Sequence, residues 1–364
     1  MEGKKTPLFD THIKYGGKIV EFGGWLLPVQ YSGIIEEHNA VRTKAGLFDV
    51  SHMGEIWADG KGAFAFLQNL VTNDLAGMQA GQIRYSPMCY QDGGTVDDLL
   101  VYKYDEELYL IVVNAANIEK DWNWMHENAV GFEVVLTNKS DETAQLALQG
   151  PAAVAILSKL TDAPVSEIQY YHFLPEVMVA GKKTMVSRTG YTGEDGYEIY
   201  CAPADAAELW EAIMAAGKDE GILPTGLGCR DTLRFESCLP LYGHELSAEI
   251  SPLAAGLGRF VKLDKEAFNG LEALQAQKAA GLPKKVMGVE VTGRGIARAG
   301  YPVKADGKVI GSVTTGSPAP TLGKNMALAL IDAAYAEIGR EIAVEVRGKD
   351  VSAVIVAKPF YKRG

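Results

Sequence analysis

The chain has 364 residues, of which 47% are hydrophobic and 22% are charged, and its formal net charge is −11. This length exceeds what one small core requires, so two or three domains are expected, and the composition is typical of a globular protein. The negative charge argues against a nucleic-acid-binding face, because such a face needs clustered Lys and Arg to neutralise phosphates.

The sequence gives no sign of a secretory signal or of a membrane anchor. Residues 1–20 contain no apolar run, and the longest apolar run, around residues 108–113, is far too short to span a bilayer. The four cysteines are widely spaced and form no Cys-x-x-Cys pair, which favours buried free thiols in a reducing compartment. We therefore expect a cytoplasmic protein, or a processed protein of the mitochondrial matrix if the source is eukaryotic.

Helix and strand patterns alternate irregularly over the first two thirds of the chain. The elements expected up to residue 128 are, in order, a helix at 33–45, a strand at 47–50, a helix at 62–70, a hairpin of 84–90 with 95–102, a strand at 108–113 and a helix at 118–128. Those expected next are a strand at 144–149, a helix opened by Pro151, strands at 185–188 and 197–201, and helices at 205–216 and 264–280. This mixture favours an α+β fold over a doubly wound sheet.

The character of the sequence changes at Val286. From there on, short strands alternate with turns rich in Gly and Pro, and helix signals are weak. This pattern predicts an all-β module of about eighty residues, built as a small barrel.

Several common cofactor motifs are absent from the sequence. No Gly-Lys pair is followed by Ser or Thr in a phosphate-binding loop, and no G-x-G-x-x-G opens a helix after a strand. There is no His-Glu-x-x-His motif, and the six histidines are scattered. We therefore expect no nucleotide cofactor and no metal.

Two adjacent carboxylates, Asp97 and Asp98, follow a glycine turn at the start of a predicted strand. Neighbouring strand residues point to opposite faces, so one aspartate should face inward with Leu100 and Tyr102. That residue is Asp98, which is a candidate for proton transfer or for stabilising positive charge. The structural alternative is that both aspartates cap the turn.

Two further charged residues occupy positions where their type is unusual. Glu198 lies within a predicted strand, so it must be hydrogen-bonded or paired if it points inward, or else lie on a solvated face. Arg230 lies near the start of a predicted helix, where a cation is unfavourable, so an anionic ligand or a structural salt bridge must compensate. Ser51 and His52 are adjacent on a strand end and therefore poorly placed to act as nucleophile and base.

Six motifs together resemble those of the aminomethyltransferase family, the T proteins of the glycine cleavage system, and they occur in the family's order. They are FDTH at 9–12, EHNAVR at 37–42, FDVSHM at 48–53, GTVDDL at 94–99, GYTGEDGYE at 190–198 and RDTLR at 230–234. ISPL at 250–253 and SPAPTLG at 317–323 extend the resemblance over essentially the whole chain.

The resemblance implies a three-domain cloverleaf around a central folate site, with a β-barrel as the last domain. The corresponding boundaries are 1–54 plus 137–260 for a first α+β domain, 55–136 for a second that carries Asp98, 261–284 for a helix and linker, and 285–364 for the barrel. It also implies a reaction in which the lipoylated H protein is the partner. Ammonia is released from its aminomethyl-lipoyl arm, and the carbon passes to tetrahydrofolate, which gives methylenetetrahydrofolate.

The family's site residues carry over to matching positions in this sequence. Asp98 corresponds to the key catalytic aspartate, expected to orient the folate amine and to stabilise a cationic carbon electrostatically. Glu198 is expected to accept hydrogen bonds from the pterin edge, and Arg230 suits the carboxylates of the folate tail. The other expected folate-binding residues, mainly aromatic side chains that flank the rings, are Tyr85, Tyr102, Tyr191, Phe173, Asn114 and Met53.

Three alternatives share the same fold. The folate domains of dimethylglycine and sarcosine dehydrogenases are fused to a flavin domain, whose glycine fingerprint is missing here. A folate-dependent demethylase would need no H protein. The folate-binding proteins of iron–sulfur cluster maintenance carry a Lys-Gly-Cys-Tyr-type loop, and this chain has Gly190-Tyr191-Thr192-Gly193 in its place.

Overall fold

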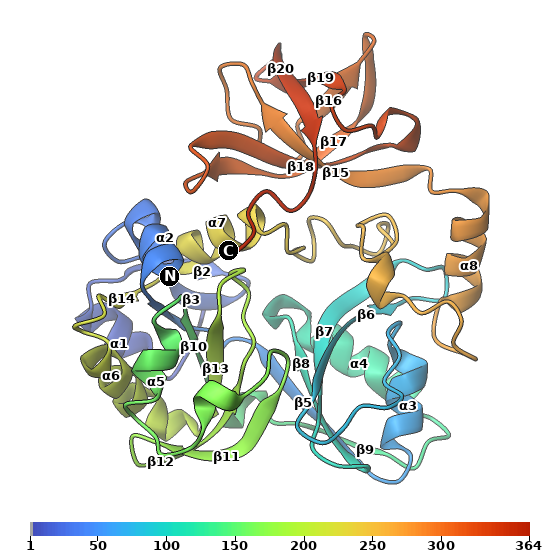
Figure 1. The fold of residues 1–364 in the computed structure, drawn as a ribbon. Helices are drawn as coiled ribbons and strands as arrows, with labels where there is room; N and C mark the ends of the chain where they lie inside the picture. The colour runs from blue at the N-terminus through green and yellow to red at the C-terminus, as the bar shows by residue number, and fades with distance from the viewer. Residues whose placement is uncertain (1–2) are drawn as a thin grey trace. The chain divides into compact units, whose positions relative to one another are not determined.

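A computed structural model describes residues 3–364 (Figure 1). The chain divides into two compact units. The first unit comprises the residues up to Leu67 together with Leu75–Tyr85 and Leu99–Leu233. The second unit comprises Gln68–Asp74, Ser86–Asp98 and Arg234–Gly364. The fold is α+β, as predicted, because mixed sheets and helices precede a C-terminal barrel. The three-domain division inferred from the family resemblance stays a prediction.

A six-stranded sheet forms the centre of the first unit. Its strands, in spatial order, are β11 (Phe173–Val179), β12 (Lys182–Ser187), β13 (Gly196–Cys201), β10 (Ala144–Gln149), β4 (Gly46–Asp49) and β14 (Leu223–Pro224). All neighbours are antiparallel except β4 and β14. A smaller sheet from the first thirty residues contains, in spatial order, β1 (Lys4–Lys5), β3 (Trp25–Gln30) and β2 (Lys18–Phe22).

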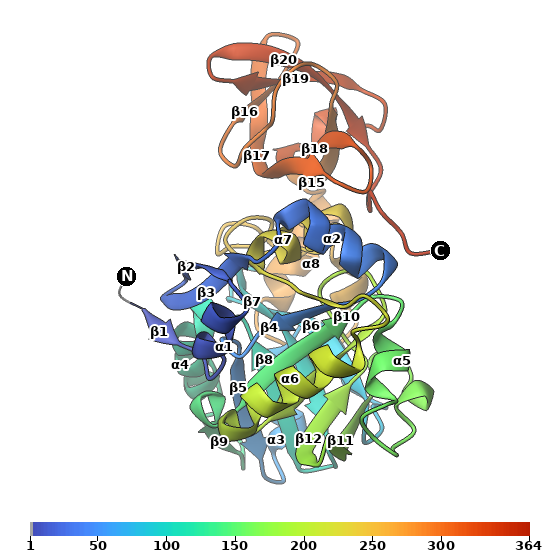
Figure 2. The same ribbon diagram turned by 90° about the vertical axis from the view of Figure 1, so that its left-hand side faces the viewer.

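The two faces of the six-stranded sheet differ in polarity because side chains alternate along each strand. On one face, Leu146, Leu148 and Ile199 join a fully apolar core. Helices α5 (Ala153–Leu157) and α6 (Ala206–Ala216) cover this face (Figure 2), and α1 (Phe9–Lys14) packs on the small sheet. The opposite face carries the polar side chains that alternate with the core residues, including Gln145 and Glu198.

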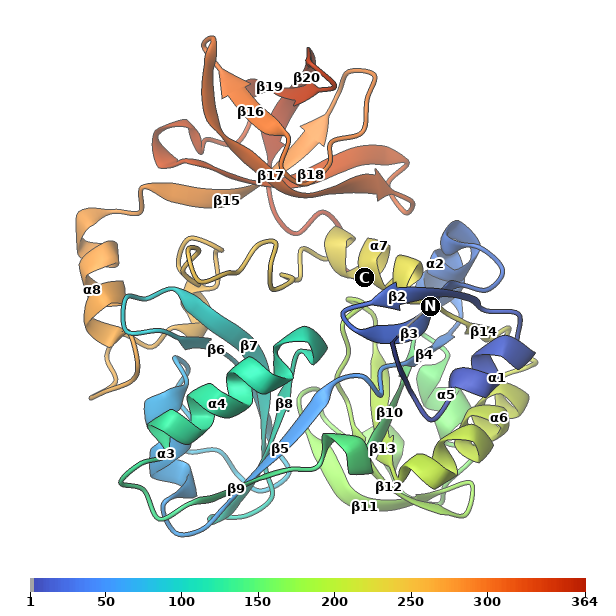
Figure 3. The ribbon, with the colours of Figure 1, turned by 180° about the vertical axis from the view of Figure 1, so that it is seen from behind.

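A five-stranded sheet contains the predicted hairpin. Its strands, in spatial order, are β6 (Ile83–Cys89), β7 (Thr95–Lys103), β8 (Leu108–Val113), β5 (Gly54–Asp59) and β9 (Val135–Asn138). The helices α3 (Ala63–Leu70) and α4 (Ile118–Asn128) lie beside this sheet (Figure 3). Gly54 allows close packing at this sheet, since a Cβ there would lie 2.7 Å from side-chain atoms of both Ile118 and Val113.

Two helices pack beside β4 in the first unit. Helix α2 (Ile34–Thr43) contributes Val41, and α7 (Leu227–Glu236) contributes Cys229 and Leu233, to a buried cluster with Phe48. The sequence therefore predicts α2 correctly. Helix α7 begins three residues before Arg230, so that Arg230 lies in its first turn, as expected.

The second unit ends in a closed six-stranded barrel, which confirms the predicted all-β module. Its strands are β15 (Lys284–Val291), β16 (Pro302–Ala305), β17 (Lys308–Ala319), β18 (Lys324–Asp332), β19 (Glu341–Val346) and β20 (Lys349–Val356), and they close in the order β15-β18-β17-β16-β19-β20. Alternating Val, Ile and Ala side chains fill the interior.

The helix predicted at residues 264–280 is too long at its start. Helix α8 spans Leu271–Ala280, because Gly270 has a left-handed backbone with φ +88°. A Cβ at Gly270 would lie 2.5 Å from the carbonyl oxygen of Tyr90, so this position accepts only glycine and interrupts the helix.

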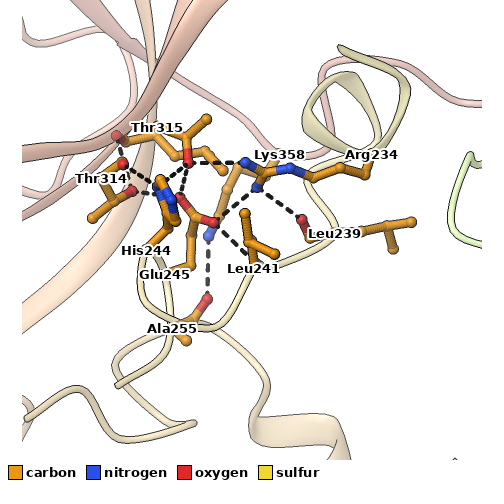
Figure 4. A network of polar contacts seen from close by, with 10 residues as sticks. Arg234, Leu239, Leu241, His244, Glu245, Ala255, Thr314, Thr315 and Lys358 are labelled. Atoms are coloured by element: carbon orange, nitrogen blue, oxygen red, sulfur yellow. Dashed lines mark hydrogen bonds and ion pairs between the residues drawn. The ribbon is translucent and has the colours of Figure 1, made fainter. Parts of the chain in front are cut away.

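A buried ion pair joins the end of α7 to the barrel within the second unit (Figure 4). Arg234 donates from Nη1 to Oε2 of Glu245 at 3.0 Å, and both side chains are almost fully buried. The hydroxyls of Thr314 and Thr315 donate to Oε1 of Glu245 at 2.6 and 2.7 Å. The carboxylate is thus satisfied on both oxygens, which a buried charge requires.

Two further findings concern membrane-spanning helices and the cysteines. Within residues 3–364, no helix is both long enough and apolar enough to cross a membrane. All four cysteines are free, as predicted. Cys89, Cys201 and Cys229 are buried, and Cys238 is half-buried.

Candidate functional site

Glu198 occupies the polar face of the six-stranded sheet, at the centre of β13. Its neighbours in register are Ala147 on β10 and Ser187 on β12. Its side chain is half-buried, and its two oxygens accept hydrogen bonds from different strands and loops: Gln145 donates from Nε2 to Oε1 at 3.0 Å, and Thr189 donates from Oγ1 to Oε2. The carboxylate is therefore held in one orientation.

The hydrogen bonds of Glu198 continue into a closed circuit of side chains. Gln145 Nε2 also bonds the hydroxyl of Tyr200 at 3.0 Å, and Tyr200 bonds the hydroxyl of Tyr102 at 2.8 Å. Ser187 closes the circuit, 3.4 Å from Tyr102 and 2.7 Å from Thr189. We call this set the Glu198 ring, and its members are Glu198, Gln145, Tyr200, Tyr102, Ser187 and Thr189.

Burial dominates the electrostatics of the Glu198 ring. Desolvation raises the pKa of Glu198, although the hydrogen bond from Thr189, the charge of Arg230 and the hydrogen bond from Gln145 all act to lower it. Desolvation likewise raises the pKa of Tyr102 and of Tyr200, so that both phenols stay neutral. Glu198 is thus the ionisable acceptor in a circuit of neutral donors.

Arg230 lies beside this carboxylate and over an aromatic ring. Its guanidinium is 4.6 Å from the ring centroid of Tyr191, within the range of a cation–π contact. The same positive charge is felt by His52, a buried residue whose pKa falls to about 4, mainly through desolvation and then through Arg230. The imidazole of His52 is therefore neutral at pH 7.

Ion pairs fix the loop that carries Tyr191. Arg42 on α2 donates to Glu194 at 2.9 Å and to the carbonyl oxygen of Thr192 at 2.7 Å, and both charged side chains are buried. Arg188 pairs with Asp195 at 2.6 Å. Since Arg42 also donates to the carbonyl oxygen of Leu233, it connects this loop to the helix that bears Arg230.

Two glycines of the loop leave room for the side chain of Gln149. A Cβ at Gly190 would lie 1.9 Å from Oε1 of Gln149, and one at Gly196 would lie 2.5 Å from its Nε2. Gln149 donates to the carbonyl oxygen of Thr189 at 3.0 Å and accepts from Thr192 at 2.8 Å. The close approach of Gln149 therefore requires glycine at both positions.

Aromatic and apolar side chains adjoin the Glu198 ring. Tyr102 packs edge-on against Phe173, with ring centroids 5.2 Å apart, and against Tyr200 at 6.0 Å. Met53 packs against this group and also against the cluster between β4 and α7. We call the first group the aromatic cluster, and its members are Ile83, Tyr102, Leu110, Val112, Phe173, Met185 and Tyr200, with Met53, Trp57, Leu100, Tyr104 and Tyr171 at its edge.

The structure thus brings together six of the expected folate-binding residues, which are Glu198, Arg230, Tyr191, Tyr102, Phe173 and Met53. Tyr85 lies in β6 and Asn114 directly follows β8, and both are half-buried. These two strands flank β7, which carries Tyr102.

The burial of the two aspartates in β7 differs from the expectation that Asp98 is the inward residue. Asp97 is fully buried, whereas Asp98 is half-buried. Asp97 shares its side of the strand with Leu99 and Val101, which are also fully covered, whereas Leu100 on the other side is half-buried like Asp98. Asp98 therefore lies on the more accessible side of β7, which suits a residue that meets a ligand.

Ser51 and His52 form no nucleophile–base pair in the structure, in agreement with the sequence argument. Ser51 donates from Oγ to the backbone carbonyl oxygen of Gln145 at 3.3 Å. The same Oγ accepts from the backbone N–H of Gln145 at 3.1 Å. These bonds tie the loop after β4 to β10. Ser51 is thus structural.

Four buried residues near Glu198 were not predicted from the sequence as site residues: Gln145, Thr189, Tyr200 and Glu55. The sequence does carry a signal for Gln145, since Gln145 and Gln149 alternate with apolar residues in the predicted strand 144–149. Glu55 is also unusual by type, because it lies in a run of apolar residues from Met53 to Ala58.

The arrangement as a whole can recognise a flat, polar ligand. An oriented carboxylate accepts hydrogen bonds, a guanidinium supplies positive charge, and aromatic side chains offer faces and edges. Within residues 3–364, no three His, Cys, Asp or Glu side chains gather in a way that could hold a metal ion. A groove of about 640 Å³ between α2 and β14 is lined by none of the expected folate-binding residues.

The chain matches two protein families along its length. Residues 8–265 match the GCVT N-terminal domain, and residues 284–362 match the glycine cleavage T-protein C-terminal barrel domain. Among solved structures, the glycine cleavage system aminomethyltransferase T from Bartonella henselae superposes with a TM-score of 0.92 at 32% identity, over 99% of this chain and 98% of that one.

Curated relatives are similar over their full length. The aminomethyltransferase of Halalkalibacterium halodurans is 55% identical over 363 residues, which cover 100% of this chain and 99% of the relative. That of Geobacillus thermodenitrificans is 58% identical over 361 residues, which cover 99% of each chain. The resemblance found in the sequence motifs is thereby confirmed: the chain belongs to the glycine cleavage T-protein family, and it is a transferase of the aminomethyltransferase type.

Proposed function

We propose that this aminomethyltransferase uses tetrahydrofolate as the acceptor and the aminomethyl-lipoyl arm of the glycine cleavage H protein as the donor. The carbon–sulfur bond of the arm breaks and the carbon forms bonds to the two folate nitrogens. The sulfur leaves as a thiol, and the amino group leaves as ammonia. The products are methylenetetrahydrofolate and the dihydrolipoyl H protein.

The observation that carries this proposal is the fixed carboxylate of Glu198. The pterin of tetrahydrofolate presents adjacent N–H donors along one edge, and a carboxylate can accept two of them. Gln145 and Thr189 already hold Glu198 in one orientation, so the ligand meets a preorganised acceptor. The half-buried position of Glu198 leaves it accessible on the polar face of the sheet.

The neighbours of Glu198 support the same ligand. Arg230 favours the ionised form of Glu198, and its charge also suits the carboxylates of the folate tail. Tyr102, Phe173 and Met53 give apolar contact for the rings. We propose that Tyr191, Tyr85 and Asn114 contribute further contacts, since Tyr191 already stacks with Arg230.

Asp98 is proposed as the catalytic carboxylate. As the carbon leaves sulfur it develops iminium-like positive charge, which a nearby carboxylate stabilises. A folate amine is already neutral and needs little help from a base, so we assign Asp98 to electrostatic stabilisation and to positioning of the amine. Its half-buried place on β7 supports contact with a ligand more than the buried place of Asp97 does.

The test measures ammonia and methylenetetrahydrofolate from aminomethyl-loaded H protein and tetrahydrofolate. The native chain should form both in equal amounts, and only when both substrates are present. Asp98→Asn should lower kcat by about 10²–10³, as removal of one electrostatic stabiliser does in other enzymes, while the Kd for tetrahydrofolate stays within about twofold.

Asp97→Asn serves as the matched variant. Because Asp97 is fully buried, its substitution should lower the unfolding temperature, with a smaller effect on kcat of the folded fraction. A loss of kcat that follows Asp97 instead would refute the assignment to Asp98. A native chain that binds tetrahydrofolate but gives no product with loaded H protein would refute the reaction and favour a demethylase or a folate-binding protein.

A further inference from the structure

One motif of the sequence, EHNAVR at 37–42, contributes none of the expected folate-binding residues. It lies on α2, and three of its side chains bond helix α7 or the residue that precedes it: Glu37 bonds Gly226, His38 bonds Thr232, and Arg42 bonds Leu233. Helix α7 carries Arg230 in its first turn. The motif therefore holds the helix on which Arg230 lies, and the contact of Glu37 is at the start of that helix.

Glu37 is a buried anchor at this contact. It is 0% exposed, and its carboxylate accepts hydrogen bonds from three backbone amides. Oε1 accepts from the N–H of Tyr31 at 2.6 Å and from that of Gly33 at 3.1 Å, and Oε2 accepts from the N–H of Gly226 at 2.9 Å. Residues 31–33 connect β3 to α2, so one carboxylate joins this connection to the start of α7. Both oxygens are satisfied, as burial of a carboxylate requires.

Gly226 transmits this anchor to Arg230. Its carbonyl oxygen accepts from the backbone N–H of Arg230 at 3.0 Å, which begins the helical bonding of α7. A Cβ at Gly226 would lie 2.6 Å from the carbonyl oxygen of Val29, so the start of α7 packs directly on the backbone of β3. A carboxylate at a helix N-terminus is also favourable, which offsets part of the cost of a cation in the same turn. The first turn of α7 is therefore fixed by Glu37 and by β3 together.

We propose that Glu37 is a positioning residue, which holds Arg230 where its guanidinium meets the carboxylates of the folate tail. This inference rests on the proposed function. Glu37 does not bind the ligand itself, because it is fully buried and both of its oxygens bond backbone amides. It fixes the backbone from which the long side chain of Arg230 extends. Arg42 fixes the other side of the same contact, since it holds the loop of Tyr191, on which the guanidinium stacks.

The tail of the ligand offers a comparison that isolates Arg230. Tetrahydrofolate has two carboxylates in its glutamate tail, and the tail diamide has the same rings and nearly the same shape without the charge. A correctly placed arginine distinguishes these ligands, because it pairs more strongly with a carboxylate than with an amide. Glu198 meets the rings, so it treats both ligands alike. Displacement of Arg230 should therefore remove the preference for the charged tail and leave the affinity for the diamide unchanged.

The test is the Kd of both ligands, measured by calorimetry under reducing conditions. The native protein should bind tetrahydrofolate about tenfold more tightly than the diamide, and Arg230→Gln should reduce this preference to about twofold or less. Glu37→Gln keeps the size of the side chain but replaces one acceptor oxygen by a donor, which cannot bond a backbone N–H. It should reduce the preference to about threefold or less, with the Kd of the diamide within about twofold. Added to Arg230→Gln, it should change the Kd of tetrahydrofolate by less than about twofold.

A matched control and a second measurement complete the design. Glu36→Gln is the control, because Glu36 is the exposed neighbour of Glu37 on α2, and it should leave the Kd of both ligands unchanged. Hydrogen exchange of the native protein needs no variant. An amide at the start of a helix ordinarily exchanges fast, since it has no partner within the helix. The Gly226 amide should instead exchange within about tenfold of the rate of the Leu233 amide later in α7, because Glu37 accepts from it.

Each contrary result has a distinct meaning. Equal weakening of both ligands in Glu37→Gln, an unchanged preference, or an equal effect of Glu36→Gln overturns the positioning role of Glu37. Exchange of the Gly226 amide at the rate of an unbonded amide also overturns it, whether or not Glu37→Gln folds. A native protein without a preference overturns it together with the tail contact of Arg230, and leaves tetrahydrofolate as the proposed acceptor. A native protein that binds neither ligand overturns the proposed function itself.

Discussion

The side-chain amide of Gln145 donates a 3.0 Å hydrogen bond to Oε1 of Glu198, from a strand 53 residues earlier in the chain. A second bond from the same nitrogen reaches Tyr200. The carboxylate therefore has its orientation set by a side chain on the adjacent strand. Affinity for a ligand edge with two donors should depend on this carboxylate.

Substitution of Glu198 by Gln tests that dependence. The amide keeps the size of the side chain but loses one acceptor and the charge, so we expect the Kd for tetrahydrofolate to rise roughly tenfold to hundredfold, which corresponds to about 1.5–3 kcal/mol for a charged hydrogen bond. Calorimetric titration measures this directly. Glu208→Gln, at an exposed position of α6, is the control, and an equal effect of both substitutions would contradict the role of Glu198.

The pH dependence of folate binding should depend on the charge of Arg230. Binding through an ionised Glu198 is lost as the pH falls through the pKa of this group, which burial already raises. Arg230 opposes that rise, so Arg230→Gln should move the acid limb of the binding curve to higher pH. The measurement is Kd from pH 5 to 8 for both proteins. An acid limb at the same pH in both would show that Arg230 does not act on Glu198.

Stability below pH 6.5 should depend on His52. In the unfolded chain this histidine takes up a proton near pH 6.5, whereas in the folded protein its pKa is about 4. The unfolded state therefore binds more protons between these values, and the free energy of unfolding should fall as the pH drops from 6.5 to 4, by up to about 3 kcal/mol. Urea denaturation should show a shallower fall in His52→Gln. An identical pH dependence of stability in the native protein and in His52→Gln would show that His52 does not cause this loss.

Removal of one partner of the buried pair Arg234–Glu245 should lower stability more than replacement of both partners by apolar residues. Glu245→Leu alone leaves a buried guanidinium without its carboxylate and should cost about 3–5 kcal/mol of stability in the second unit. Arg234→Met combined with Glu245→Leu should restore part of this loss. Denaturation midpoints of the single and double variants give the coupling energy, and strict additivity would contradict a coupled pair.

The fold is largely readable from local sequence patterns, and the errors have local causes. Alternation of apolar residues predicts the hairpin of β6 and β7 and the C-terminal barrel, because register and burial follow the period of the strand. The helix expected at 264–280 fails at Gly270, where a left-handed backbone and a close carbonyl are invisible in the residue pattern.

The site is less readable because its contacts are non-local. Glu198, Arg230 and Tyr102 emerge from unusual residue types and from family motifs, but their surroundings depend on which strands pair. The bond from Gln145 to Glu198 exists only because β10 lies beside β13. The exposure of Asp98 relative to Asp97 depends on which side of β7 is fully covered, which alternation alone cannot tell.

The Glu198 ring also has a direction. An ionised carboxylate can only accept, so Thr189 must donate to Glu198, and each hydroxyl before it must then donate to the next one in the ring. The donors then follow in a single order, Tyr200, Tyr102, Ser187 and Thr189, until the last hydrogen reaches Glu198. Every hydroxyl dipole thus runs the same way round and converges on the carboxylate. A proton gained at Glu198 would let the carboxyl group donate as well as accept, so the single order of the donors depends on the ionised carboxylate.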